Sequence, residues 1–135
     1  MKRTIFNPKT LVKPMAPYSY AAIVEARRFL IIAGQVAIDK KGKVVGKGDL
    51  ERQFNQVYAN LGAVLKAAGA TFQNVVQFTT FLVNSRDIPA FGKARNTLYK
   101  KIFPRGDYPP NTLLVIDRLF MEDLLLEVEA IAALD

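Results

Sequence analysis

Cysteine, histidine and tryptophan are all absent from the 135 residues of the chain. Without thiols, the chain cannot form disulfide bonds, thiolate nucleophiles, or zinc and iron–sulfur sites with cysteine ligands. Without imidazole, a serine–histidine catalytic triad and most transition-metal sites are excluded as well. Any catalysis must therefore depend on carboxylates, Arg, Lys, Tyr, hydroxyl groups or backbone amides.

Long apolar segments are also missing. Prolines and charged residues interrupt every apolar run in residues 1–20, so we expect neither a signal peptide nor a membrane span there. A later run, FLIIAGQVAI, ends at Asp39, short of the roughly 18 uncharged residues that a transmembrane helix needs. We therefore expect a cytoplasmic protein with no membrane contact.

Basic residues outnumber acidic ones by 19 to 12, which gives a net charge of +7. Local excesses lie near the N-terminus, around Gly42 and along residues 93–105, so the charge is dispersed. In the last segment the basic residues punctuate the solvent face of an expected helix, and no nucleic-acid-binding motif accompanies them. The charge therefore indicates a solvated surface and argues against a nucleic-acid partner.

The length and the absence of repeats or linkers predict one domain over residues 1–135, with a loosely ordered arm at about 1–15. Alternating and β-branched segments predict strands, the first two forming an antiparallel pair across a turn at Arg27-Arg28. Apolar residues at steps of three and four predict two helices. The expected order is β-β-α-β-α-β-β, with strands at 19–26, 29–39, 75–83, 112–116 and 124–132, and helices between Asp49 and Gly69 and between Asp87 and Pro104.

This order is an α+β layout in which the two helices cover one face of a mixed sheet. The second face of the sheet would stay bare in a monomer. A bare apolar sheet face on a domain of this size is an assembly surface, so we expect oligomerisation.

Two acidic residues lie on one side of the last predicted strand. Strand alternation places Glu127 and Glu129 opposite the apolar set. One interpretation is a solvated face that discourages aggregation between strands. The other is that one carboxyl group lies in a partly desolvated cleft, has a raised pKa, and handles a proton or a water molecule. The pattern alone leaves both interpretations open.

Three further positions have both a structural and a functional interpretation. Gly34 interrupts an apolar strand, where glycine marks a bulge or the close approach of a ligand. Tyr18 is either a packing aromatic or a lid over a ligand. Asn111 follows a stiff double proline and either presents a polar group at a sheet end or simply ends the loop. No glycine-rich phosphate-binding motif and no nucleophile-elbow motif are present.

Taken in order, these features are similar to those of one known family. The segments that carry the similarity span nearly the whole chain from Ala16 and read APYSYA, FLIIAGQVAID, QVYANLGAVLKAAGA, VVQFTTFLVN and LLLEVEAIAAL. They resemble the reactive intermediate deaminase (Rid) family, also called the YjgF family and formerly known as L-PSP endoribonucleases or translation inhibitors. The last segment is especially close to the family's C-terminal signature.

The resemblance implies a chorismate-mutase-like fold that assembles as a homotrimer with a barrel-like core. It also implies small-molecule sites in clefts between neighbouring subunits. Active family members hydrolyse enamines and imines, such as 2-aminoacrylate, to a 2-keto acid and ammonia. The family uses no metal and no organic cofactor, so neither is expected for this chain.

Carried over residue by residue, the resemblance assigns four positions to the cleft. Tyr18 matches a tyrosine that lines it, and Gly34 matches the glycine whose backbone approaches the ligand. Asn96 falls near a pocket asparagine. Glu127 matches the glutamate proposed to orient or activate the attacking water.

A fifth position departs from the family pattern. Deaminating members have an arginine, in an FPxRS or YPxRS segment, that grips the substrate carboxylate. The same segment reads YPPNT in this chain, so Asn111 replaces the arginine and Leu113 replaces the small or thiol residue two positions later. Asparagine carries no charge and cannot form the two-pronged contact of a guanidinium. Losing two charge-assisted hydrogen bonds would weaken carboxylate binding by about 3 kcal/mol, on the order of a hundredfold. Arg105 and Arg118 are alternative sources of a guanidinium.

The sequence therefore predicts a Rid-family homotrimer whose intersubunit clefts bind a small metabolite, with weak or absent activity on 2-aminoacrylate. Two alternatives stay open. One is an active imine deaminase with altered substrate recognition. The other is a non-enzymatic regulatory protein that binds a ligand or RNA.

Overall fold

The structure is a computed structural model that describes residues 1–135. Three strands precede α1, β4 separates α1 from α2, and two strands follow α2. The short 3-10 helices η1 (Phe72–Asn74) and η2 (Ser85–Asp87) precede β4 and α2. The bounds are β1 Lys2–Phe6, β2 Ala21–Glu25, β3 Arg28–Val36, α1 Leu50–Ala67, β4 Val75–Leu82, α2 Ile88–Ile102, β5 Asn111–Val115 and β6 Leu126–Leu134.

Local chemistry marks both ends of α1 and the first turn of α2. The Asp49 side chain accepts a hydrogen bond from the backbone N–H of Arg52 at 3.1 Å and caps α1. Gly69, with a φ of +70°, follows the last turn of α1. Pro89 lies in the first turn of α2, where its missing N–H leaves no bond unmade. Neither helix has the length and apolar content that a membrane span requires.

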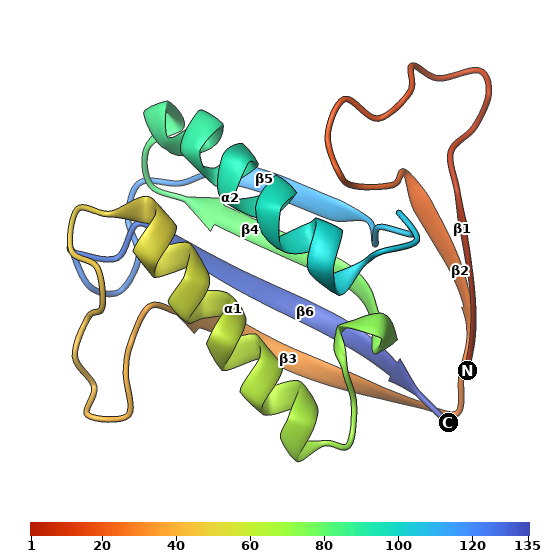
Figure 1. Ribbon diagram of the computed structural model, residues 1–135, viewed down its shortest axis with the longest axis horizontal. Helices are drawn as coiled ribbons and strands as arrows, with labels where there is room; N and C mark the ends of the chain where they lie inside the picture. Colours follow the sequence, from red (N-terminus) through yellow and green to blue (C-terminus); the bar gives the residue numbers. More distant parts are fainter.

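A four-stranded mixed sheet forms the centre of the fold, in the order β3-β6-β4-β5. β4 and β5 are parallel and the other neighbours are antiparallel. Both helices cover the same face of this sheet (Figure 1), which confirms the predicted α+β arrangement. The opposite face carries no helix, and Phe29, Ile31 and Leu114 are exposed on it.

The N-terminal residues differ from the prediction of a loosely ordered arm at about 1–15. Lys2–Phe6 form β1, which pairs antiparallel with β2, so that Lys2 lies opposite Glu25 and Phe6 opposite Ala21. Residues after Phe6 form no further regular element before β2. The segment KRTIF has three polar residues followed by two apolar ones, so its sequence lacks the polar–apolar alternation that predicts a strand, although exposure alternates along it in the structure.

The predicted pairing of the first two strands is also wrong. β2 pairs with β1 in a separate two-stranded sheet, whereas β3 pairs with β6. The residues between β2 and β3 are Ala26 and Arg27, and neither favours the left-handed conformation that tight hairpin turns require. The nine-residue β6 instead offers β3 a partner along most of its length.

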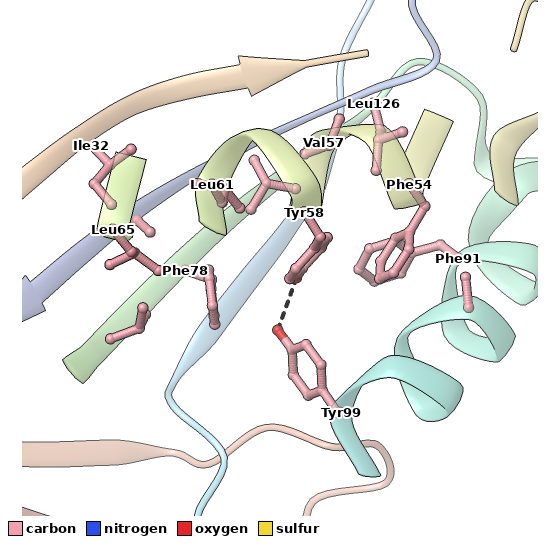
Figure 2. Packing of buried hydrophobic residues seen from close by; sticks show 14 of the residues in the cluster. Ile32, Phe54, Val57, Tyr58, Leu61, Leu65, Phe78, Phe91, Tyr99 and Leu126 are labelled. Carbon is pink, nitrogen blue, oxygen red and sulfur yellow. Dashed lines mark hydrogen bonds between the residues drawn. The ribbon is translucent and has the colours of Figure 1, made fainter. Parts of the chain in front are cut away.

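A cluster of aromatic and aliphatic side chains fills the space between the helices and the sheet (Figure 2). Tyr58 on α1 and Tyr99 on α2 are almost fully buried, and their hydroxyl groups form a hydrogen bond at 2.9 Å. Burial raises the pKa of Tyr58 to about 12. Phe54 and Phe78 are completely buried around this pair. The cluster fixes α2 relative to the sheet, and α2 carries part of the candidate site.

Arg3 connects β1 to the loop that precedes β5. Its side chain is 6% exposed and contacts Asp107 Oδ2 through Nη2 at 2.8 Å. Its other terminal nitrogen donates a hydrogen bond to the carbonyl oxygen of Val75. Because the guanidinium is buried, removing it leaves the Asp107 carboxylate with only the solvent-exposed Arg105 as a partner.

Replacing Arg3 by Met is therefore expected to lower the free energy of unfolding by about 2 kcal/mol. Lys2→Met is the matched control, because the Lys2–Glu25 ion pair one residue away is exposed and contributes little. Urea denaturation of both variants measures the difference. Equal midpoints for Arg3→Met and Lys2→Met would contradict a structural role for the buried guanidinium.

Candidate functional site

Glu127 and Gly34 lie together on the sheet face that no helix covers. Glu127 is half-buried, between two β6 residues that point into the core. The pairing of β3 with β6 shifts register between Ile32 and Gln35, and Gly34 lies within this irregularity. A Cβ atom at position 34 would overlap the Glu127 carboxylate. Only glycine therefore leaves room for the carboxylate at this place.

The environment of Glu127 shifts its proton affinity. Burial raises the pKa of Glu127 above 4.5, and the negative charge of Glu129 raises it further. Glu129 is exposed, so the solvated-face interpretation describes Glu129. Glu127 is partly buried and has a raised pKa, as expected for a carboxyl group that handles a proton or a water molecule. A half-buried carboxyl group of this kind can accept a proton from a water molecule and return it.

The titration of Glu127 provides a direct check of these two causes. Carbon-13 NMR of the side-chain carboxyl group is expected to give a midpoint above 4.5, because burial penalises the charged form. Glu129→Gln should lower this midpoint by removing a like charge, while the larger effect of burial keeps it above 4.5. A midpoint that stays fixed or rises in Glu129→Gln would contradict this account. Any activity that needs the Glu127 carboxylate should accordingly increase as pH rises through the midpoint.

Asn111 is the first residue of β5 and lies next to Phe78 on the parallel strand β4. Its side-chain oxygen accepts a hydrogen bond at 2.9 Å from the hydroxyl group of Thr80, which is completely buried. Leu113, two residues later, is half-buried and packs against the core on the helix side of the sheet. The side chain at position 111 is thus neutral, and its hydrogen bond with Thr80 of β4 fixes its position.

The two alternative arginines are engaged elsewhere. Arg105 is 77% exposed at its side chain, and its Nη2 atom lies 3.4 Å from Asp107 Oδ2. Arg118 donates a hydrogen bond from Nε to its neighbour's carbonyl oxygen and lies 3.8 Å from the Glu122 carboxylate. Neither side chain lines the cavity described next. They therefore do not supply the guanidinium missing at position 111 within the subunit.

A cavity of about 590 Å³ lies between α2, residues 14–17 and Leu113 of β5. Asn96 of α2 lines it, so the structure brings two of the predicted site residues together there. Tyr18 lines a neighbouring hollow of about 530 Å³ instead. The two hollows share Tyr108 in their walls and are therefore adjacent. Hydrophobic residues make up six of the eleven that line the larger cavity but only four of the eleven that line the smaller hollow, so the larger one is closer to the apolar lining usual for small-molecule sites.

The same cavity contains a residue that the sequence did not single out. Arg95 of α2 lines it and is only 7% exposed. Its guanidinium carbon lies 5.0 Å from the centroid of the Phe91 ring, a cation–π contact that contributes about 0.5–2 kcal/mol. Burial lowers the pKa of Arg95, and the buried Nε atom has no hydrogen-bond partner. No ion pair of the chain includes Arg95.

The predicted site residues thus form two groups on opposite faces of the sheet. Glu127 and Gly34 lie on the bare face, whereas Asn96 and Leu113 line the cavity on the helix side. Along β4, Glu127 is opposite Phe81 and Asn111 is opposite Phe78. The backbones of Glu127 and Asn111 are therefore three residues apart along the strand direction and two strands apart across the sheet. This geometry corresponds to a distance of about 14 Å. One subunit alone therefore does not gather all the residues around one ligand.

Acidic side chains form no cluster of three that could hold a metal ion. The chemistry available at Glu127 is proton transfer and the orientation of water. The chemistry available in the cavity is the binding of an anion by Arg95 and of apolar groups by its walls.

Comparison with known proteins relates these residues to a family. The family model described as "Endoribonuclease L-PSP" matches residues 9–134. A RutC family protein of Pyrococcus horikoshii is 39% identical over 132 residues, which cover 98% of each chain. A mouse protein named 2-iminobutanoate/2-iminopropanoate deaminase is 34% identical over 130 residues, covering 96% of this chain and 90% of the mouse protein.

A solved structure agrees with these matches. The crystal structure of YyfB from Yersinia pestis, a protein of unknown function in the conserved Rid family, superimposes with a TM-score of 0.87 and 38% identity, covering 99% of this chain and 100% of that one. This superposition over nearly the whole of both chains agrees with the α+β fold described above. The chain therefore belongs to the Rid family, also called the YjgF or RutC family.

Proposed function

We propose that the protein is a homotrimer that binds a small metabolite in clefts between neighbouring subunits. The bare sheet face supports assembly, because Phe29, Ile31 and Leu114 leave it apolar and exposed in the monomer. The separation of the predicted site residues supports an intersubunit site. With Glu127 on one face and Asn96 on the other, a complete site needs residues from two copies of the chain.

The chemistry that fits Glu127 is the hydrolysis of an imine. Water adds to the carbon of the C=N bond while the carboxylate accepts its proton. The proton that Glu127 accepts passes to the imine nitrogen, which gives a carbinolamine. The hydroxyl proton of the carbinolamine then reaches the nitrogen, the C–N bond breaks, and ammonia and a carbonyl product remain. The raised pKa of Glu127 and the space that Gly34 leaves for its carboxylate support this role. The name of the mouse relative, a 2-iminobutanoate/2-iminopropanoate deaminase, supports the reaction class.

The observation that carries the proposal on specificity is the state of position 111. Asn111 accepts a hydrogen bond from Thr80 and carries no charge, so it cannot hold a substrate carboxylate as an arginine does. Two charge-assisted hydrogen bonds to a substrate carboxylate are missing at this position. Their absence should weaken carboxylate binding by about 3 kcal/mol, which is on the order of a hundredfold. We therefore expect weak or absent hydrolysis of 2-aminoacrylate and of its tautomer 2-iminopropanoate.

An ammonia-release assay on imines of several amino acids and on an uncharged imine tests this function. Sedimentation of the same preparation tests the trimer. The expected results are trimers, slow release from 2-iminopropanoate and faster release from an imine that does not depend on a guanidinium at position 111. No release from any imine by an intact trimer would exclude the deaminase reaction and leave ligand binding.

A further inference from the structure

The cavity on the helix side of β5 contains a cation that no group of the chain neutralises. Arg95 is more than nine-tenths buried, its Nε atom has no hydrogen-bond partner, and no carboxylate forms an ion pair with it. Burying a charge without a partner is unfavourable, and such charges in proteins are normally paired. Asp and Glu are also absent from the cavity wall. An anionic ligand is the partner that this arrangement lacks.

We propose that this cavity binds the carboxylate of a small organic acid with an apolar chain, and that the Arg95 guanidinium is its anion contact. The inference rests on the proposed function, because it names the ligand class of the site that includes Asn96 and Leu113. Asn111 does not line this cavity, so a carboxylate that Arg95 holds from α2 lies at a different place, and Arg95 does not replace the contact missing at position 111.

The geometry of Arg95 suits a carboxylate. Its guanidinium carbon lies 5.0 Å from the centroid of the Phe91 ring, and its Nε–H group has no acceptor in the chain, so N–H donors remain for a ligand. A guanidinium edge matches the two oxygens of a carboxylate. Inorganic phosphate carries between one and two charges and more acceptor oxygens, and the cavity wall offers one cation for them. We therefore favour a monoanionic carboxylate.

The rest of the cavity favours an apolar chain on that acid. Its wall includes Ile88, Phe91 and Leu113, and Met15 lies at its rim, 86% exposed. The volume of about 590 Å³ falls in the range of small-molecule sites. Leu113 adds apolar surface to the wall from β5. Branched aliphatic acids should consequently bind more tightly than the methyl compound pyruvate.

Isothermal titration calorimetry with 4-methyl-2-oxopentanoate as the probe tests the inference on the full-length protein. The wild type should bind this acid, bind pyruvate more weakly, and show no binding of inorganic phosphate or of the uncharged 4-methylpentan-2-one. Arg95→Met should weaken binding of the probe about a hundredfold, because two charge-assisted hydrogen bonds are lost. Arg95→Lys should recover part of the affinity by restoring the charge without the fork.

Gly92→Leu provides a second variant that leaves Arg95 intact. Gly92 lines the cavity within α2, and a Cβ atom there meets no atom within 4 Å, so a leucine side chain has room to start at this position and is expected to extend into the cavity. Leucine also favours the helix more than glycine does, so the variant should fold. Gly92→Leu should weaken binding of the probe, as Arg95→Met does. Arg105→Met, the matched control, removes an exposed guanidinium outside the cavity and should bind within about twofold of the wild type.

Several results would overturn the inference. These are a wild type that fails to bind the probe, phosphate binding as tight as that of the keto acid, and probe affinity unchanged in both Arg95→Met and Gly92→Leu. Calorimetry does not depend on catalysis, so the outcome separates the two proposals. Binding that Arg95→Met abolishes, in a protein that releases no ammonia from any imine, would support the carboxylate site and contradict the deaminase reaction. Ammonia release from an imine, together with probe binding that Arg95→Met does not change, would support the deaminase reaction and contradict the carboxylate site.

Discussion

Glu127→Gln is expected to lower ammonia release from the best imine substrate at least a hundredfold, with the fold and assembly unchanged. General acid–base catalysis contributes about 10²- to 10⁴-fold, and glutamine keeps the shape of glutamate while losing its ability to accept a proton. Glu127 is half-buried and its side chain lies over Gly34, so the change leaves the packing intact. Glu129→Gln is the matched control. Its activity at pH 7 should equal that of the wild type, because Glu129 is exposed.

Gly34→Ala provides an independent route to the same loss. The new Cβ atom would overlap the Glu127 carboxylate and displace it. Gly34 is not among the glycines with positive φ, so alanine fits the backbone conformation and any loss reports the displaced carboxylate. Full activity in both Glu127→Gln and Gly34→Ala would exclude Glu127 from catalysis.

The second large effect is expected from Asn111→Arg. An arginine at the start of β5 restores the two-pronged carboxylate contact, and kcat/KM for 2-iminopropanoate should increase on the order of a hundredfold. Breaking the hydrogen bond between Asn111 and Thr80 reduces stability, but about 1 kcal/mol is small against the stability of a domain.

Two further variants separate charge from shape at position 111. Asn111→Met also loses the hydrogen bond with Thr80 and gains no charge, so it should show no increase. Asn111→Lys supplies a charge without the fork and should give a smaller increase than Asn111→Arg. An Asn111→Arg variant that is no faster than Asn111→Met would show that the missing arginine does not limit activity.

Strong local periodicity explains which parts of the fold the sequence predicted. The three- and four-residue spacing of apolar residues and the caps at Asp49 and Gly69 are contained within α1, so its bounds followed from local chemistry. β1 was missed because its evidence is distant in sequence. Its strand partner lies at Ala21–Glu25, and the Asp107 that pairs with Arg3 is 104 residues away.

The candidate site was predictable only in part, for a similar reason. Gly34 and Glu127 each had a local signal, but their contact depends on the register shift between β3 and β6. The charge pattern places Arg95 with the basic residues of a solvent face, whereas in the structure Arg95 is buried. Its position four residues after Phe91, on the apolar stripe of α2, was the signal that separates it from Lys93 and Lys100. A charge that falls on an apolar helix face is a candidate for a ligand contact.

We propose that Asn111 holds no substrate carboxylate in this Rid-family chain, and that its hydrolysis of 2-iminopropanoate is slow for that reason. The most direct test measures kcat/KM for ammonia release from freshly generated 2-iminopropanoate by this protein and by the mouse 2-iminobutanoate/2-iminopropanoate deaminase under identical conditions. The account predicts a value for this protein that is lower on the order of a hundredfold. Equal values for the two proteins would contradict it.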